Sequence, residues 1–177
     1  DDIEFCQLLA GTGEFVTNAV LFGVTRRGRL LLCLPKDTGA AVKTLSLYPP
    51  QTRIAKGFVR CIKVLILLRI HRLLPKINLE IRDGGPLSKL MHQEGKIGAL
   101  LGNPKGSTRC ALVLRYDEGE LVVDKIAVVK LACVSVKYDA EIIKSLPKGL
   151  KGLPDLCGHR EGNIWAFYTT NYVDGRS

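Results

Sequence analysis

A lysine and a glutamate that could form an ion pair are the residues of this chain with the clearest chemistry. Lys130 follows the apolar run Leu121–Val129, which favours a β-strand, and Glu141 lies further on in a stretch with helical spacing. A lysine that ends a strand and is held by a glutamate on the next helix can offer a point charge to nucleotide phosphates. Lys125 is the alternative lysine, because it would lie on the opposite face of the strand. The pattern predicts a nucleotide-binding site and leaves the choice of lysine open.

The elements that must position this pair read as antiparallel strands with one main helix. Asp117–Glu118–Gly119–Glu120 is typical of a hairpin turn. A helix is expected from Ser135 or Val136 to Leu146, where Pro147 stops it. Apolar runs bounded by turn residues predict the strands, which we expect at Ile97–Leu101, Thr108–Tyr116, Leu121–Leu131, Leu153–Gly158 and Ile164–Thr169.

A separate region is expected before this sheet. Asp83–Gly84–Gly85–Pro86 marks a turn or linker, so we predict one unit over residues 1–83 and a second over residues 84–177. The first unit should contain a small sheet and a basic amphipathic helix. Its strand-like runs are Asn18–Val24, Arg29–Leu34 and Ala41–Tyr48, and the turn-prone Arg26–Arg27–Gly28 separates the first two.

The basic helix is expected from Thr52, a suitable N-cap, to Leu74, and Pro75 should end it. The formal net charge of the chain is +9, and the excess lies mainly in this segment, where no acid separates Arg53, Lys56, Arg60, Lys63, Arg69, Arg72 and Lys76. An ordinary core helix would carry these cations as a solvated face opposite a buried stripe, and we favour that interpretation. The charge also permits an anionic partner such as phosphate, nucleic acid or an acidic lipid surface.

Composition favours a folded cytoplasmic protein. The chain has 177 residues, of which 46% are hydrophobic and 24% charged, as in globular proteins. Its six cysteines lie at least 23 residues apart without a CxxC pair or zinc-ligand spacing, which suits buried thiols in a reducing compartment. No apolar run is long enough to span a bilayer, although association with a membrane surface through the basic helix stays open.

Residues 97–177 resemble the N-terminal lobe of the aminoglycoside phosphotransferase and choline kinase-like family, which has a protein-kinase-like fold. Five motifs in order carry the resemblance: Leu101–Gly102–Asn103–Pro104–Lys105–Gly106–Ser107, Ala127–Ala132, Asp139–Pro147, Leu153–Gly158 and Trp165–Gly175. The resemblance implies an α+β fold in which an antiparallel five-stranded sheet and one main helix form a kinase-like N-lobe. Residues 1–80 look like an N-terminal extension of some bacterial members.

The resemblance also implies roles for the matched residues. The loop at Gly102, Asn103, Lys105, Gly106 and Ser107 would cradle nucleotide phosphates. Lys130 would contact the α- and β-phosphates and Glu141 would orient it. Thr170, Asn171 and Tyr172 would form the hinge, whose main-chain groups bind the adenine edge.

The implied function is the ATP-binding N-terminal portion of a small-molecule phosphotransferase, which moves a phosphoryl group from Mg-ATP to a hydroxyl acceptor. In this family the catalytic and metal-binding residues follow the hinge. The resemblance therefore implies that the chain is a fragment without catalytic or metal-binding residues, that it needs the missing C-lobe for Mg²⁺, and that it is inactive alone. The alternative is a non-catalytic interaction module or pseudokinase whose basic helix binds anionic lipid, nucleic acid or a protein through Arg53, Lys56, Arg60 and Lys63.

Overall fold

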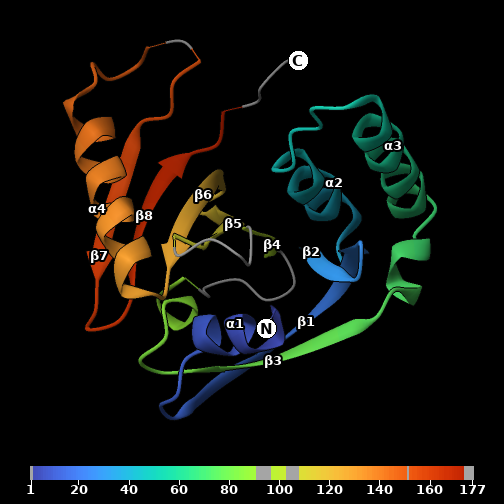
Figure 1. The fold of residues 1–177 in the computed structure, drawn as a ribbon, viewed down its shortest axis with the longest axis horizontal. Helices are drawn as coiled ribbons and strands as arrows, with labels where there is room; N and C mark the ends of the chain where they lie inside the picture. The colour runs from blue at the N-terminus through green and yellow to red at the C-terminus, as the bar shows by residue number, and fades with distance from the viewer. Residues whose placement is uncertain (1, 91–96, 103–107, 151, 174–177) are drawn as a thin grey trace.

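The computed structural model describes residues 2–90, 97–102, 108–150 and 152–173, and it is an α+β fold (Figure 1). Eight strands form one antiparallel sheet in the order β3-β1-β2-β4-β5-β6-β8-β7. The strands are β1 (Phe15–Arg26), β2 (Arg29–Leu34), β3 (Lys76–Arg82), β4 (Gly98–Leu101), β5 (Cys110–Asp117), β6 (Glu120–Ala127), β7 (Leu156–Glu161) and β8 (Ala166–Asn171). The helices are α1 (Asp2–Ala10), α2 (Thr38–Ser46), α3 (Arg53–Leu67) and α4 (Lys130–Ser145), with the short 3₁₀ turns η1 (Ile70–Leu73) and η2 (Leu87–Lys89).

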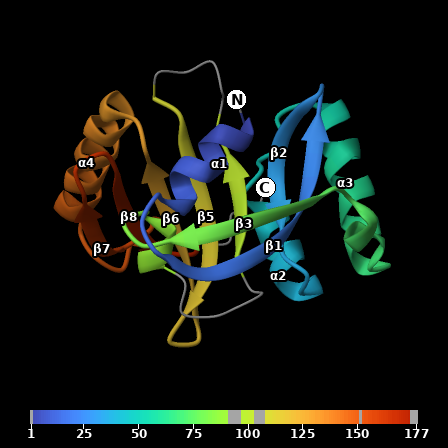
Figure 2. The ribbon, with the colours of Figure 1, turned by 90° about the horizontal axis from the view of Figure 1, so that it is seen from below.

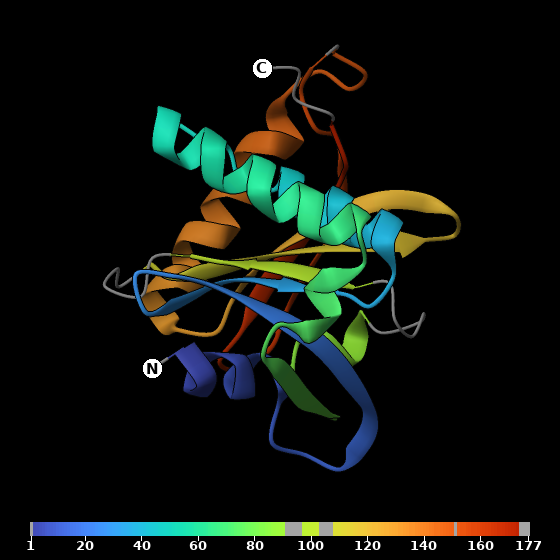
Figure 3. The same cartoon turned by 90° about the vertical axis from the view of Figure 1, so that its right-hand side faces the viewer.

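The prediction of an α+β fold is confirmed, but the prediction of a sheet with five strands is wrong. Strands from both sides of residue 83 join in one sheet, because β2 pairs with β4 through Leu32 and Leu100. Helix α4 covers the β6–β8–β7 end of the sheet, and α2 and α3 cover the opposite end (Figures 1 and 2). Figure 3 shows α2, α3 and α4 on one side of the sheet and α1 on the other.

Both tight hairpin turns that the sequence predicts are confirmed. Asp117 pairs with Glu120 across Glu118 and Gly119, which have φ values of 49° and 90°. Arg26 pairs with Arg29 in the same way, and the intervening Arg27 and Gly28 also have positive φ. Two central residues with positive φ match the right-handed twist of paired strands, which explains why the chain reverses within two residues in both hairpins.

The expected strand at Ala41–Tyr48 is wrong, because most of this segment lies in α2. The side chain of Asp37 caps the helix by accepting a hydrogen bond of 2.8 Å from the Ala40 N–H. Ala41 and Leu45, four residues apart, are buried on one face. The short apolar run therefore has a helical period, and its β-branched residues did not decide its structure.

The basic helix forms, but it is shorter than predicted. Thr52 caps it as expected, accepting from the Ala55 N–H at 3.1 Å. α3 ends at Leu67 rather than near Leu74, because Arg69 takes a left-handed conformation with φ of 60° and the chain continues as η1. α1 and β3 were not expected from the sequence.

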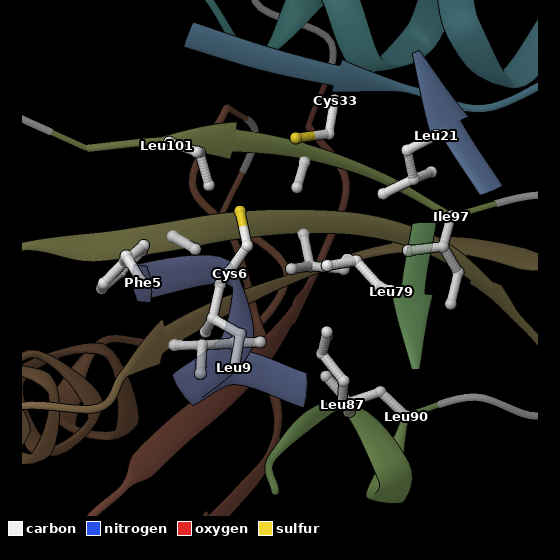
Figure 4. Packing of buried hydrophobic residues seen from close by; sticks show 14 of the residues in the cluster. Phe5, Cys6, Leu9, Leu21, Cys33, Leu79, Leu87, Leu90, Ile97 and Leu101 are labelled. Carbon is white, nitrogen blue, oxygen red and sulfur yellow. The ribbon is translucent and has the colours of Figure 1, made fainter. Parts of the chain in front are cut away.

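The two faces of the sheet bury different clusters. Below the sheet, α1 contacts β3 and η2 and shares one apolar cluster with residues of β1–β6. Figure 4 shows the thiols of Cys6 on α1 and Cys33 on β2 directed toward each other. Above the sheet, Ala41, Leu45, Ile62 and Ile66 of α2 and α3 pack on β1 and β2. A side chain at Gly98 of β4 would overlap Thr44, so α2 lies directly against the sheet there.

A buried polar network joins the central strands on the α1 side. The guanidinium of Arg115 donates to Asp124 at 2.8 Å, and Thr169 donates to the other carboxylate oxygen at 2.5 Å. Asp124 is fully buried. Burial raises the pKa of Asp124 above its ordinary value, and the hydrogen bonds from Thr169 and Arg115 oppose that rise.

Within the described residues, no helix has both the length and the apolar character that crossing a membrane would require.

Candidate functional site

Four side chains form a row across the sheet on the face that α4 covers. The strand register places Leu100 of β4 opposite Leu112 of β5, Leu112 opposite Lys125 of β6, and Lys125 opposite Tyr168 of β8. Directly opposed residues project to the same face, so two leucines, one lysine and one tyrosine are side by side. This row places a cation next to an apolar surface.

The row forms the floor of a cavity of about 600 Å³. Ser135 of α4 lines one side, the chain between β4 and β5 contributes Gly102, Thr108 and Arg109, and β5 contributes Cys110. A volume of this size suits a small-molecule ligand, and an apolar lining with few polar groups is typical of such sites.

Lys125 is held in the cavity by an ion pair with α4. Its Nζ atom lies 2.5 Å from Oδ2 of Asp139, and the two side chains are 28% and 31% exposed. Burial is the largest influence on the pKa of Lys125 and lowers it. The hydrogen bond with Asp139, together with the negative charges that Tyr168, Asp139 and Cys110 carry when ionised, raises the pKa above its ordinary value of 10.5. Lys125 is therefore a cation at neutral pH.

Burial keeps two neighbours of Lys125 in their neutral forms at neutral pH. Burial raises the pKa of the Tyr168 phenol and of the Cys110 thiol. Lys125 thus lines the cavity together with a phenol, a thiol and a second cation, Arg109, whose guanidinium lies 2.6 Å from Oδ1 of Asp2. This set can bind an anionic group at one end and an apolar ring on Leu100 and Leu112.

The loop between β4 and β5 begins with a close backbone contact. The N–H of Gly102 donates to the Cys110 carbonyl at 2.9 Å, and a Cβ at Gly102 would lie only 2.5 Å from that oxygen. Glycine is therefore needed where the loop leaves the sheet. Gly102 lines the cavity, and its predicted role in a phosphate loop stays a prediction; Asn103, Lys105, Gly106 and Ser107 lie outside the described residues.

The structure does not bring Lys130 and Glu141 together. β6 ends at Ala127, and Lys130 is the first residue of α4, the helix that also contains Glu141. Eleven residues along one helix separate the two by roughly 16 Å at about 1.5 Å per residue, and both are exposed. The predicted ion pair between them is therefore wrong, and Lys125 with Asp139 occupies the corresponding arrangement of strand and helix.

The predicted hinge residues lie at the end of β8, but their N–H groups are in use. The N–H of Asn171 donates to the Asp155 carbonyl at 3.3 Å, and that of Tyr172 donates to the Leu121 carbonyl at 2.9 Å. Thr170 is buried within the sheet opposite Val123. Neither N–H is available to donate to the edge of a base in this structure, which corrects that part of the predicted adenine contacts.

Tyr172 also connects the end of the sheet to α2. Its hydroxyl forms a 2.6 Å hydrogen bond with the Ser46 hydroxyl, and the ammonium of Lys43 lies 5.4 Å from the centre of its ring. The chain segment that follows β8 is thereby held near α2.

The described residues hold no group of three or more His, Cys, Asp or Glu side chains arranged to bind a metal ion. The cavity combines the paired ammonium of Lys125 with apolar strand residues and has the volume of a small-molecule site.

Sequence reasoning missed Asp139, Tyr168 and Leu112. A signal for Lys125 was present in the alternation of Val122, Asp124 and Ile126 with Val123 and Lys125, which places the lysine on the face away from the α1 core. Ser135 and Asp139, four residues apart, fall on one face of a helix. Their position over Lys125 depends on where α4 begins, which periodicity alone does not give.

Comparisons of this chain with protein-family models, with curated proteins and with solved structures found no match. The function is therefore inferred from the geometry of the cavity and from the sequence motifs.

Proposed function

We propose that this chain is the ATP-binding portion of a small-molecule phosphotransferase and that ATP occupies the cavity beside Lys125. The ion pair between Lys125 and Asp139 on the cavity wall carries the proposal. In kinase-like proteins a strand lysine, paired with an acid on the following helix, contacts nucleotide phosphates. Lys125 and Asp139 have this relationship, with an aspartate in place of the usual glutamate.

The arrangement of the second half of the chain supports the proposal. Strands β4, β5, β6, β8 and β7 are consecutive in the sheet, and α4 connects β6 to β7. A kinase-like N-lobe has five antiparallel strands with its main helix after the third strand, as the resemblance implies. The three further strands extend this unit on the β4 side.

Each part of the cavity has a distinct role in the proposal. The ammonium of Lys125 binds the α- and β-phosphates as a point charge, and Asp139 fixes its position. Gly102 lets the chain leave β4 in close contact with the Cys110 carbonyl at the edge of the cavity. Leu100 and Leu112 offer an apolar surface for the base.

Phosphoryl transfer to a hydroxyl acceptor requires further groups that position Mg²⁺ and the acceptor. The proposal assigns none of these to the described residues. What this chain contributes is the binding and orientation of the nucleotide, and the acceptor is a small molecule with a free hydroxyl.

Calorimetric titration of ATP into the Lys125→Met variant tests the proposal, with Lys130→Met as the matched control. Loss of a phosphate-binding cation is expected to weaken ATP binding at least roughly tenfold, which corresponds to about 1.4 kcal/mol. Lys130→Met removes the same charge at the start of α4 and should bind ATP as the wild type does. Equal affinity in the Lys125→Met variant and the wild type, or no ATP binding by the wild type, would overturn the proposal.

A further inference from the structure

Helix α3 lies on the outside of the molecule with one side buried. Ala55, Ile62 and Ile66 are buried, and Ile62 and Ile66 pack in the cluster formed with β1, β2 and α2. Figure 3 shows the helix lying across the outer surface, above α2 and the sheet. An ordinary amphipathic helix would present only polar residues on its other side.

The exposed side of α3 has an apolar stripe. Ile54, Val64 and Leu68 are 80%, 52% and 63% exposed. Together with the exposed Gly57 and Cys61 they recur at intervals of three and four residues, which places all five along one line of the helix surface. Leu73 of η1, 84% exposed, adds a further apolar side chain beyond the end of the helix. The fold therefore leaves this stripe exposed to solvent.

A basic stripe runs beside the apolar one. Arg53, Lys56, Arg60 and Lys63 are all exposed on α3, and at about 100° per residue they fall on the arc next to the apolar stripe. No Asp or Glu occurs in the sequence between Asp37 and Glu80, whereas eight Lys and Arg residues do. The positive field of α3 is therefore not neutralised by acids close in the sequence.

We propose that α3 docks this chain on the surface of an anionic lipid membrane, with the helix axis parallel to the bilayer plane. The basic stripe matches lipid phosphates, and the apolar stripe matches the boundary between headgroups and acyl chains. This chemistry favours lipid over nucleic acid, because a nucleic acid would satisfy the cations and leave the leucine, valine and isoleucine side chains in water. The proposal does not depend on ATP binding.

The experiment measures co-sedimentation of the 177-residue chain with vesicles of phosphatidylcholine mixed with phosphatidylglycerol, and with vesicles of phosphatidylcholine alone. Binding is expected only to the anionic vesicles and should weaken as salt is added. Replacing Lys56, Arg60 and Lys63 by Gln should reduce the partition coefficient ~100-fold, since each cation contributes about fivefold near an anionic surface. Replacing Ile54, Val64 and Leu68 by Ser should also abolish binding at equal charge.

A matched control removes three exposed lysines elsewhere, as Lys130→Gln/Lys144→Gln/Lys148→Gln. This variant loses the same charge but should bind vesicles about as well as the wild type. Near-ultraviolet circular dichroism and thermal melting verify that each variant is folded. Because the changed side chains are exposed, the folded state should persist.

Three outcomes would overturn the proposal. The first is no sedimentation of the wild type with anionic vesicles at low salt. The second is equal loss of binding in the control variant, which would make net charge rather than α3 responsible. The third concerns the variant in which Ile54, Val64 and Leu68 are replaced by Ser. If it still binds vesicles, and binds a soluble polyanion such as RNA as well as the wild type does, the surface would be assigned to nucleic acid. Analytical ultracentrifugation tests a second copy of the chain as the occupant. If the wild type is a dimer that does not bind vesicles, and the dimer is lost when Ile54, Val64 and Leu68 are replaced by Ser, the stripe would be assigned to a second copy of the chain.

Discussion

The Nζ atom of Lys125 lies 2.5 Å from Oδ2 of Asp139 and joins the last part of β6 to the middle of α4. The contact brings together residues that are 14 positions apart in the chain. It holds the side chain of Lys125, which is part of the cavity floor, toward α4. The proposed nucleotide site depends on this contact, and the predictions below follow from it and from the packing around it.

Replacing Asp139 by Asn should lower ATP affinity. The neutral amide holds the ammonium less strongly, so Lys125 would lose its fixed position, and we expect a loss of roughly five- to tenfold by calorimetry. Glu141→Gln removes the same charge from the same helix and should have no effect. A carboxylate restored as Asp139→Glu should recover part of the affinity, whereas unchanged affinity in Asp139→Asn would contradict a positioning role.

Cys110 should be protected by nucleotide. Its thiol lines the cavity, and burial raises its pKa, so alkylation by iodoacetamide should already be slow at neutral pH. ATP at about ten times its dissociation constant should slow the reaction roughly tenfold further, because only the unliganded chain reacts. Mass spectrometry of the alkylated peptides measures the rate. Cys61 and Cys157, both exposed, serve as internal controls, and protection of all three would indicate a general effect instead.

The network of Arg115 and Asp124 should be a strong determinant of stability. Asp124→Ala would leave the Arg115 side chain, 7% exposed, without its buried partner and with only the more exposed Asp117, whose Oδ2 lies 3.0 Å from Nη1 of Arg115. Breaking a buried pair in this way costs about 3–5 kcal/mol of the free energy of unfolding. Urea denaturation followed by circular dichroism measures the change. Glu120→Ala, at the exposed turn of the same hairpin, should cost far less, and equal costs would contradict the role of the buried pair.

The ion pair of Lys125 also predicts a pH dependence of stability at alkaline pH. Since the folded-state pKa of Lys125 is raised above 10.5, the folded chain holds this proton more tightly than the unfolded chain. The stabilisation is complete below the unfolded pKa and is lost as pH rises through the folded value. Wild type should therefore be more stable than Lys125→Met by about 0.5–1 kcal/mol near neutral pH.

The difference between wild type and Lys125→Met should shrink above about pH 10.5. Urea denaturation of both proteins at a neutral and an alkaline pH measures it. The raised pKa of Tyr168 also makes the stability of the folded chain fall as pH rises. The Tyr168→Phe variant lacks this contribution and therefore isolates that of Lys125. A difference that grows with pH would contradict the assignment.

Local chemistry made part of this structure predictable. The two positive-φ turns at Arg27–Gly28 and Glu118–Gly119 require residues that tolerate a left-handed backbone, and glycine at the second position supplies it. Thr52 was identifiable as a cap because its hydroxyl can reach the third N–H of the following helix. These features depend on contacts within four residues.

The site itself was less predictable. The run from Leu121 to Leu131 is mostly apolar, and periodicity did not show that the strand stops at Ala127 and the helix begins at Lys130. α4 has no side-chain cap to mark its start. If the strand continued to Lys130, that lysine and Lys125 would face opposite sides of the sheet, because neighbouring strand residues alternate between the two faces. Where the strand ends therefore decides which lysine lines the cavity.

What the sequence by itself determined is the α+β character, the two hairpins, the capped basic helix and the presence of lysines and acids around residues 125–141. What only the tertiary structure decided is which of these meet. The register of β5, β6 and β8 places Lys125 between Leu112 and Tyr168, and the packing of α4 on that face places Asp139 over it. The physical reason is that pairing across strands and packing of a helix on a sheet depend on long-range burial, whereas caps and turns are fixed by neighbouring residues.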